Sequence, residues 1–171
     1  MKRKRLMALG MVVAVVLAGG YWTAGDAIVA AGAAASEEAQ TKEDIRAVLA
    51  AYTEAFEAKN IDGVMACFAD SDQTVVMGTG PGEIWVGKES IRSAHMAFMA
   101  SAEKEKSNRT LVGSGVDGNT AWLAGYLEAV QTLESGEMAF QLNLSLVLTK
   151  QEGEWRILCM HFSNLVGPEG Q

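Results

Sequence analysis

Cysteine, histidine and proline are all scarce in this chain of 171 residues, which has two of each. The cysteines, Cys67 and Cys159, and the histidines, His95 and His161, are spread along the chain and match no metal-binding motif. We therefore expect neither a bound metal nor a cofactor. A disulfide is permitted if the chain is exported. Each cysteine lies in an apolar stretch, however, so we expect both to pack as small hydrophobic side chains.

Basic residues are scarce beyond the first five positions. Fourteen basic and 21 acidic residues give a net charge of −7. Four of the basic residues form the start of the chain, Lys2-Arg-Lys-Arg5, so the remainder is still more acidic. Such a surface repels phosphate backbones and anionic lipid headgroups. We therefore expect no nucleic-acid partner.

The N-terminal segment has the layout of an export signal. The basic start precedes an uncharged apolar run and a stretch of small residues with Ala-x-Ala sites near position 33. The uncharged run extends to Gly25, however, and about 20 apolar residues suffice for a membrane anchor. We expect residues 1–35 to be a signal peptide or an anchor, which is the only part that would contact a membrane. Either leaves the domain outside the cytoplasm: periplasmic, secreted or membrane-anchored.

Three helices are expected in the first half of the chain. Residues 36–40 are expected to be a flexible tether, and Thr41 with Asp44 resembles a capping box that would start a helix. Asn60 ends that helix or caps a short second one, and Gly87 precedes a third. Apolar residues recur at helical spacing in all three segments: Ile45, Val48, Leu49, Tyr52, Phe56; Val64, Met65, Phe68; Ile91, Ala94, Phe98, Met99. His95 shares the face of the third group.

The remaining segments predict strands. These are residues 74–77, 83–86, 110–116, 120–133, 138–150 and 154–163, with residues 102–108 expected to be a polar loop. Helices first and an antiparallel meander afterwards indicate an α+β fold in one domain, residues 41–165, followed by a tail at 166–171.

Alternation in the last two strands predicts an apolar and a polar face of the sheet. Leu142 to Leu148 repeats leucine at every second position, and Leu158, Met160 and Phe162 share a face. The opposite face carries hydrogen-bonding side chains: Asn143, Ser145, His161 and Ser163. We expect this polar face to meet water or to pair with a second copy.

The chain from about Thr41 to Ser163 resembles the nuclear transport factor 2-like superfamily and, within it, the SnoaL-like group. The resemblance rests on Cys67-Phe-Ala-Asp70, on Gly87-Lys-Glu-Ser-Ile91, and on Gly153-Glu-Trp-Arg-Ile157 with His161-Phe-Ser163. It implies a cone-shaped half-barrel, in which a curved antiparallel sheet wraps three N-terminal helices. It also implies a pocket at the open end and, usually, a homodimer.

The first helix is similar to that of steroid isomerases in this superfamily. Tyr52 matches the tyrosine that stabilises an enolate in those enzymes. Their aspartate base would fall near Val76 or Met77, and neither side chain accepts a proton. No aspartate follows Asp117 that could serve as the second acid. The resemblance therefore does not carry over isomerase activity.

His95 and Glu128 are the remaining candidates for an acid and a base beside Tyr52. A carboxylate on a cavity face would have a raised pKa, but we interpret Glu128 as a solvated strand residue. We interpret His95 as a half-exposed helical histidine and Tyr52 as a core aromatic. We therefore predict no catalytic set from these three candidates.

The expected ligand pocket has apolar walls and no proton acceptor. Asn143 stands where many family members carry an arginine, which argues against an anionic ligand. The residues expected at the pocket are Tyr52, Met77, Trp85, His95, Phe98, Trp122, Tyr126, Met160 and Phe162. The sequence thus predicts a domain that binds a small apolar molecule or has an accessory role. An isomerase, cyclase or dehydratase, and a homodimeric association module, are the alternatives.

Overall fold

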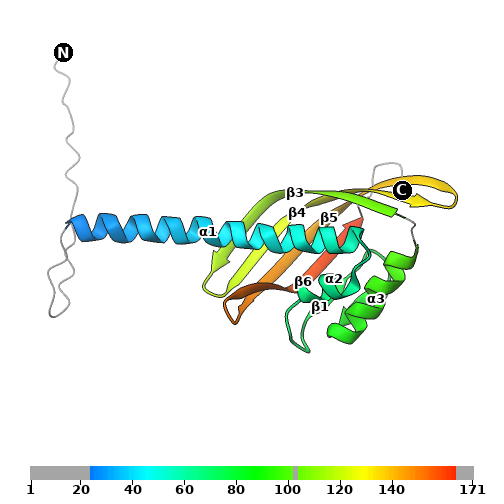
Figure 1. Ribbon diagram of the computed structural model, residues 1–171, viewed down its shortest axis with the longest axis horizontal. Helices are drawn as coiled ribbons and strands as arrows, with labels where there is room; N and C mark the ends of the chain where they lie inside the picture. The colour runs from blue at the N-terminus through cyan, green and yellow to red at the C-terminus, as the bar shows by residue number, and fades with distance from the viewer. Residues whose placement is uncertain (1–23, 102–103, 165–171) are drawn as a thin grey trace, which may run out of the picture. The chain divides into compact units, whose positions relative to one another are not determined.

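The computed structural model describes residues 24–101 and 104–164 (Figure 1). Most of the expected leader and the whole expected tail, residues 166–171, lie outside this range. The chain divides into two compact units, Met1–Glu38 and Ala39–Gln171. Among the described residues, no helix combines the length and the apolar character that a membrane span requires.

Helix α1 spans Ala24–Glu57 and therefore begins earlier than predicted. Residues 36–40, expected to be a flexible tether, are helical. Thr41 and Asp44 form no capping box, because Thr41 lies inside α1; the Asp44 carboxylate instead accepts a hydrogen bond from Gln40 Nε2 at 2.8 Å. The segment before Thr41 is rich in alanine and glutamate and contains no proline, so its helix propensity is high.

Helices α2 (Ile61–Ala66) and α3 (Lys88–Ser101) match the two shorter predicted helices. Asn60 caps α2, where its side-chain oxygen accepts a hydrogen bond from the Gly63 N–H at 3.0 Å. Gly87, at φ +78°, turns the chain into α3. Both helices bury their apolar sides, including Val64, Met65 and Ile91.

Six strands form one curved, unclosed sheet in the order β2-β1-β6-β5-β4-β3, with the helices on one face (Figure 1). The strands are β1 (Val75–Met77), β2 (Ile84–Val86), β3 (Lys104–Asp117), β4 (Thr120–Leu133), β5 (Gly136–Gln151) and β6 (Glu154–Asn164). All neighbours are antiparallel except β1 and β6, which run parallel. The α+β cone predicted from the sequence is confirmed, with this one parallel pairing.

The start of β3 corrects the expected loop at residues 102–108. Lys104 to Arg109 pair with β4, from Lys104 opposite Thr132 to Arg109 opposite Leu127. Their burial alternates, with Glu105, Ser107 and Arg109 half-buried and the residues between them exposed. The segment is polar on both faces and has weak strand propensity, which the pairing with β4 overrides.

Strand β6 contains a bulge that changes its inward-facing residues. Val147 lies opposite Cys159 while the next residue, Leu148, lies opposite Ile157, so Leu158 is the extra residue. The prediction that Leu158 shares the buried face was therefore wrong, because the bulge shifts the alternation by one position. Ile157 and Met160 are buried on that face, whereas Leu158 is only half-buried.

The core lies between the helices and the inner face of the sheet. Leu144, Leu146 and Leu148 of β5 are buried there, as the alternation predicts. The end of α2 is tied to β6, since Ala69 and Ile157 each donate a backbone hydrogen bond across this junction at 2.8 Å. Cys67 and Cys159 are both free thiols.

The outer face of the sheet carries the predicted polar residues. Asn143 lies opposite Ser163 and donates a 3.4 Å hydrogen bond to its hydroxyl group. Ser145 lies opposite His161 in the same pair of strands.

Candidate functional site

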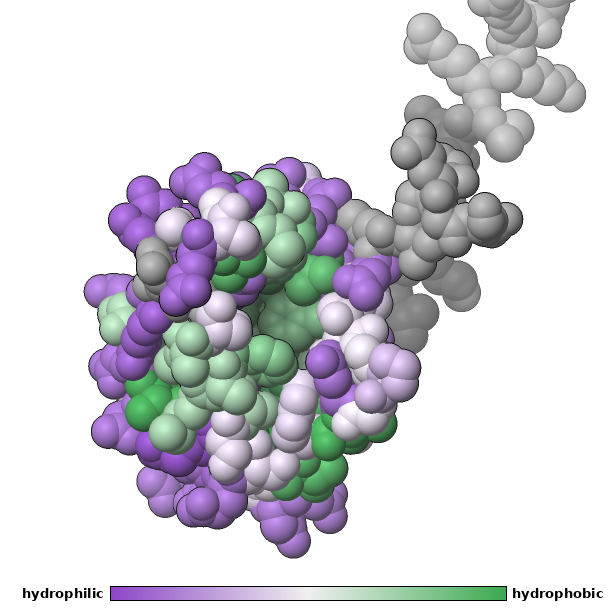
Figure 2. Space-filling model, turned by 90° about the vertical axis from the view of Figure 1, so that its right-hand side faces the viewer, coloured by the Kyte–Doolittle hydropathy of each residue, from purple (hydrophilic) through white to green (hydrophobic). Residues whose placement is uncertain are grey.

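A cavity of about 590 Å³ lies between the helices and the inner face of the sheet. Figure 2 shows a hollow bordered mainly by apolar residues at the end of the domain that faces the viewer. Its walls combine six aromatic side chains and several apolar ones with a smaller set of polar groups. The aromatic residues are Tyr52, Phe56, Trp85, Phe98, Phe140 and Phe162, and the side chains with polar groups are Thr79, Glu83, His95, Glu105, Arg109, Gln131, Gln141 and Asn164.

Tyr52 and His95 form a buried hydrogen-bonded pair in the wall of this cavity. His95 Nδ1 lies 2.8 Å from the Ile91 carbonyl oxygen, which only accepts, so this nitrogen carries the proton. His95 Nε2 is then the acceptor for the Tyr52 hydroxyl group, 3.0 Å away. The pair joins α1 to α3 with both imidazole nitrogens in use.

Burial shifts both pKa values away from a proton-transfer role. Desolvation lowers the pKa of His95, while its hydrogen bond to Ile91 opposes the shift. Desolvation also raises the pKa of the Tyr52 hydroxyl well above its usual range, although Arg109 acts against this. A phenolate or an imidazolium is thus disfavoured, so the pair is poorly suited to act as a general base.

Arg109 of β3 brings the one cationic side chain among the described cavity-lining residues. Its Nη1 donates hydrogen bonds to the hydroxyl groups of Thr53 and Ser107. Its guanidinium carbon lies 5.4 Å from the centre of the Tyr52 ring, a cation–π contact. Burial lowers the pKa of Arg109, whereas Tyr52 and nearby glutamates favour the charged form.

Two carboxylates also line the cavity, and each already has hydrogen-bond donors. Glu83 Oε2 accepts from the backbone N–H groups of Thr79 and Gly80, both at 2.8 Å. Glu105 Oε2 accepts from Gln131 Nε2 at 2.7 Å. The expectation of walls without any proton acceptor is therefore wrong.

The structure brings together five of the nine residues expected at the pocket: Tyr52, Trp85, His95, Phe98 and Phe162 line the cavity. Met77 does not, because the register places it opposite His161 on the outer face of the sheet. Met160, opposite Val76, is buried in the core and does not line the cavity.

Trp122 and Tyr126 do not line the cavity either, since both belong to the outer face of β4. The Trp122 ring lies over Gly113 and Gly115 and is 50 % exposed. Tyr126 lies between Thr110 of β3 and Asn143 of β5. Both residues lie at even positions of β4, whereas the buried residues Leu123 and Leu127 lie at odd ones.

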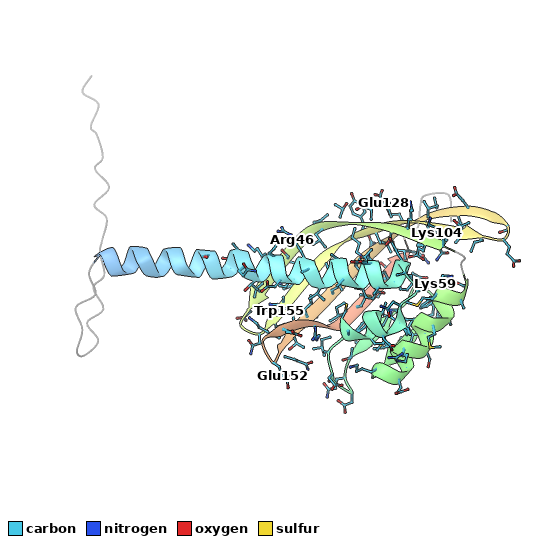
Figure 3. All side chains as sticks on the ribbon, in the orientation of Figure 1. Arg46, Lys59, Lys104, Glu128, Glu152 and Trp155 are labelled. Atoms are coloured by element: carbon cyan, nitrogen blue, oxygen red, sulfur yellow. The ribbon has the colours of Figure 1, made fainter. Side chains whose placement is uncertain are left out.

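The three candidate catalytic residues do not converge. Glu128 is exposed on the side of the sheet turned away from the helices (Figure 3), opposite Asn108 and Gln141. It is absent from the cavity that holds Tyr52 and His95. His95 is only 2 % exposed, which corrects the expectation of a half-exposed histidine.

Sequence reasoning missed Glu105 and Arg109 because it placed residues 102–108 in a loop and began the following strand only at Thr110. The signal that could have found them is the spacing of Glu105, Ser107 and Arg109 at every second position, typical of one strand face. Glu83 was missed although it lies two positions before Trp85 in the predicted strand 83–86, a spacing that places both side chains on one strand face.

Comparison with known proteins agrees with the geometry. A model of the SnoaL-like domain family matches residues 45–167. No curated protein matches the chain. A protein of unknown function from Mycobacterium tuberculosis is similar in structure, with a TM-score of 0.69 and 20% sequence identity over 79% of this chain and 78% of that one.

Two further solved structures are similar. A nuclear transport factor 2-like superfamily protein from Salmonella enterica has a TM-score of 0.67 at 16% identity, covering 77% of this chain and 95% of its own. A dehydratase candidate of the same family from Streptomyces avermitilis has a TM-score of 0.63 at 18% identity, covering 73% and 97%. At these identities the likeness concerns the fold alone.

Proposed function

The chain belongs to the SnoaL-like domain family, and from this premise we propose that it binds a small, largely apolar molecule in the cavity without transforming it. The cavity has the volume of a small-molecule site, for which about 300–1,000 Å³ is usual. Its six aromatic side chains would supply most of the contact area.

The observation that carries this proposal is that the buried Tyr52–His95 pair makes its hydrogen bonds within the protein. The hydroxyl proton of Tyr52 is donated to His95, and the remaining ring proton of His95 is donated to Ile91. Neither residue offers a free proton or a free basic nitrogen to a ligand. An enzyme of the dehydratase or isomerase type would have to use Glu83 or Glu105 instead, and the hydrogen bonds that these carboxylates accept hold them to the wall.

The proposal is tested with the neutral fluorescent probe N-phenyl-1-naphthylamine and the full chain. Binding in the cavity should increase probe fluorescence, and Trp85→Ala should weaken the affinity by about tenfold, since a buried aromatic contact is lost. Trp122→Ala is the matched control, because Trp122 lies on the outer face of the sheet. Equal loss in both variants, or no saturable binding at all, would reject the cavity as the site.

A second candidate function, homodimeric association, is favoured by the outer face of the sheet. The polar residues Asn143, Ser145, His161 and Ser163 lie side by side there. Exposed apolar side chains flank them, including Ile84 and Val86 of β2 and Trp122 of β4. Exposed apolar side chains gathered on one face commonly mark a protein–protein interface, and the polar residues between them could form hydrogen bonds across it.

The location of the domain also belongs to the proposal. The basic start and apolar run of the leader support export, with or without cleavage. Cell fractionation combined with mass determination of the N-terminus tests this, because a cytoplasmic chain beginning at Met1 would contradict it.

A further inference from the structure

We propose that the cavity selects an apolar, preferably aromatic, molecule that carries one carboxylate group, and that Arg109 binds this group. The inference deepens the proposed function and rests on it. It names the chemical class of ligand, which the cavity's apolar walls alone leave open.

The guanidinium group of Arg109 is only partly satisfied. One of its three nitrogens, Nη1, donates to Thr53 and Ser107. Within residues 24–101 and 104–164, the other two nitrogens have no hydrogen-bond partner, and no carboxylate lies within the 4.0 Å of an ion pair. Glu57 and Glu105 act on this charge only from farther away. A guanidinium group with free donors is suited to bind a carboxylate through two parallel hydrogen bonds.

The two carboxylates that line the cavity already have hydrogen-bond partners. Glu83 and Glu105 already accept hydrogen bonds from Thr79, Gly80 and Gln131. The group still missing beside Arg109 is thus a negatively charged hydrogen-bond acceptor. This favours an anionic ligand over a cationic one, despite the acidic composition of the chain.

The aromatic rings extend from Arg109 along the cavity wall. Arg109 lies over Tyr52, Tyr52 contacts His95 edge-on, His95 contacts Phe98, and Phe98 contacts Trp85 at 5.4 Å between ring centres. A flat apolar body placed along this row would have its charged end at Arg109. The sequence argues against an anionic ligand because Asn143 of β5 stands where many family members carry an arginine. In this chain the arginine that would bind the anion comes from β3 instead.

Naphthalene-2-carboxylate and naphthalene-2-carboxamide test this selectivity, because they share shape and apolar surface and differ in charge. Isothermal titration of the full chain should show at least about tenfold tighter binding of the carboxylate, since a charge-assisted bidentate contact exceeds a neutral one. Equal affinities would overturn the inference while leaving the proposed function intact. Failure of both naphthalene probes to bind would also overturn the inference, and the proposed function would fall with it only if N-phenyl-1-naphthylamine did not bind either.

Substitutions then assign the contact to Arg109. Arg109→Gln should abolish the preference for the carboxylate and leave the carboxamide affinity within about twofold, because only the charged contact is lost. Arg109→Lys keeps the charge and should retain part of the preference. Glu105→Gln should strengthen carboxylate binding alone, because a nearby negative charge is removed. It also provides an independent test if Arg109→Gln does not fold.

Trp85→Ala locates the bound carboxylate. Arg109 also borders a second pocket, which is lined by residues of α1 and β3 and not by Trp85. Weakening of both probes by Trp85→Ala places them in the cavity. Unchanged carboxylate binding in that variant would overturn the inference.

Discussion

At the scale of single residues, the Tyr52–His95 pair shows how burial decides the role of a titratable group. Both side chains have the chemistry of acid–base catalysis, and both line a cavity. The Tyr52 hydroxyl proton and both ring nitrogens of His95 nevertheless form hydrogen bonds within the protein. Burial also disfavours the charged form of each side chain. The pair therefore contributes to stability and to the shape of the wall.

Tyr52→Phe is expected to destabilise the fold by about 1–3 kcal/mol, because His95 Nε2 would remain buried without a donor. Urea unfolding followed by circular dichroism measures this free energy. Tyr126→Phe, on the outer face of β4, is the matched control and should change the stability by less than about 0.5 kcal/mol. Equal effects of the two variants would contradict the role assigned to the buried pair.

Stability should fall as the pH is lowered through the ordinary pKa of histidine, 6.5. The pKa of His95 is lower in the fold than in the unfolded chain, so the unfolded chain binds the proton first as the pH drops. The contribution is complete above pH 6.5 and is lost progressively below it, towards the lowered folded pKa. Unfolding free energies of His95→Gln should show a weaker pH slope than those of the original chain, and an unchanged slope would contradict this role of His95.

At the scale of elements, the contact between α1 and the first half of β3 is decisive for the cavity. Glu57 of α1 accepts hydrogen bonds from the Ser107 backbone N–H at 2.7 Å and from its hydroxyl group at 3.2 Å. Because β3 is the edge strand, this N–H has no neighbouring strand as its partner. The helix thereby holds the strand that presents Glu105 and Arg109.

Glu57→Ala is expected to loosen this end of β3 and to cost about 1.5–3 kcal/mol, the usual range for a hydrogen bond to a charged group. Hydrogen exchange of residues 104–109 should accelerate, while exchange in β5 should not change. Glu54→Ala removes an exposed carboxylate one turn earlier and should leave both measurements unaltered. Unchanged exchange at residues 104–109 in Glu57→Ala would rule out this role.

The same segment shows where sequence reasoning succeeds and where it fails. The leucine alternation of β5 and the helical stripe containing Ile45 and Tyr52 report burial directly, so these elements were predictable. Lys104 to Arg109 carry no apolar signal, and only pairing with β4 makes them a strand. The bulge at Leu158 likewise depends on the partner strand. Glu105 and Arg109 were therefore missed, whereas Tyr52, Trp85, His95 and Phe98 were found.

At the scale of the whole molecule, the two faces of the sheet have different surroundings. The inner face packs against the helices and borders the cavity. The outer face combines the polar stripe at Ser145 and His161 with exposed apolar side chains such as Trp122, which is 50 % exposed. Exposed apolar surface of this kind commonly marks an interface.

Ser145→Arg should therefore abolish dimer formation, because a two-fold axis near the polar stripe would bring two like charges together. Sedimentation equilibrium measures the change, with the original chain expected to be a dimer. Met96→Arg places the same charge on an exposed position of α3 and should leave the dimer intact. A monomeric original chain would contradict the association proposal.

The parallel pairing of β1 with β6 has a consequence for biosynthesis. Val76 pairs with Met160 of β6, the strand that is synthesised after the other five strands of the sheet, and Ile157 of β6 also anchors the end of α2. Until β6 has been synthesised, β1 and the end of α2 lack this pairing partner, so closure of the hydrophobic core waits for β6. Such a delay suits a polypeptide that must be threaded through a translocation channel before it folds, as the proposed export requires.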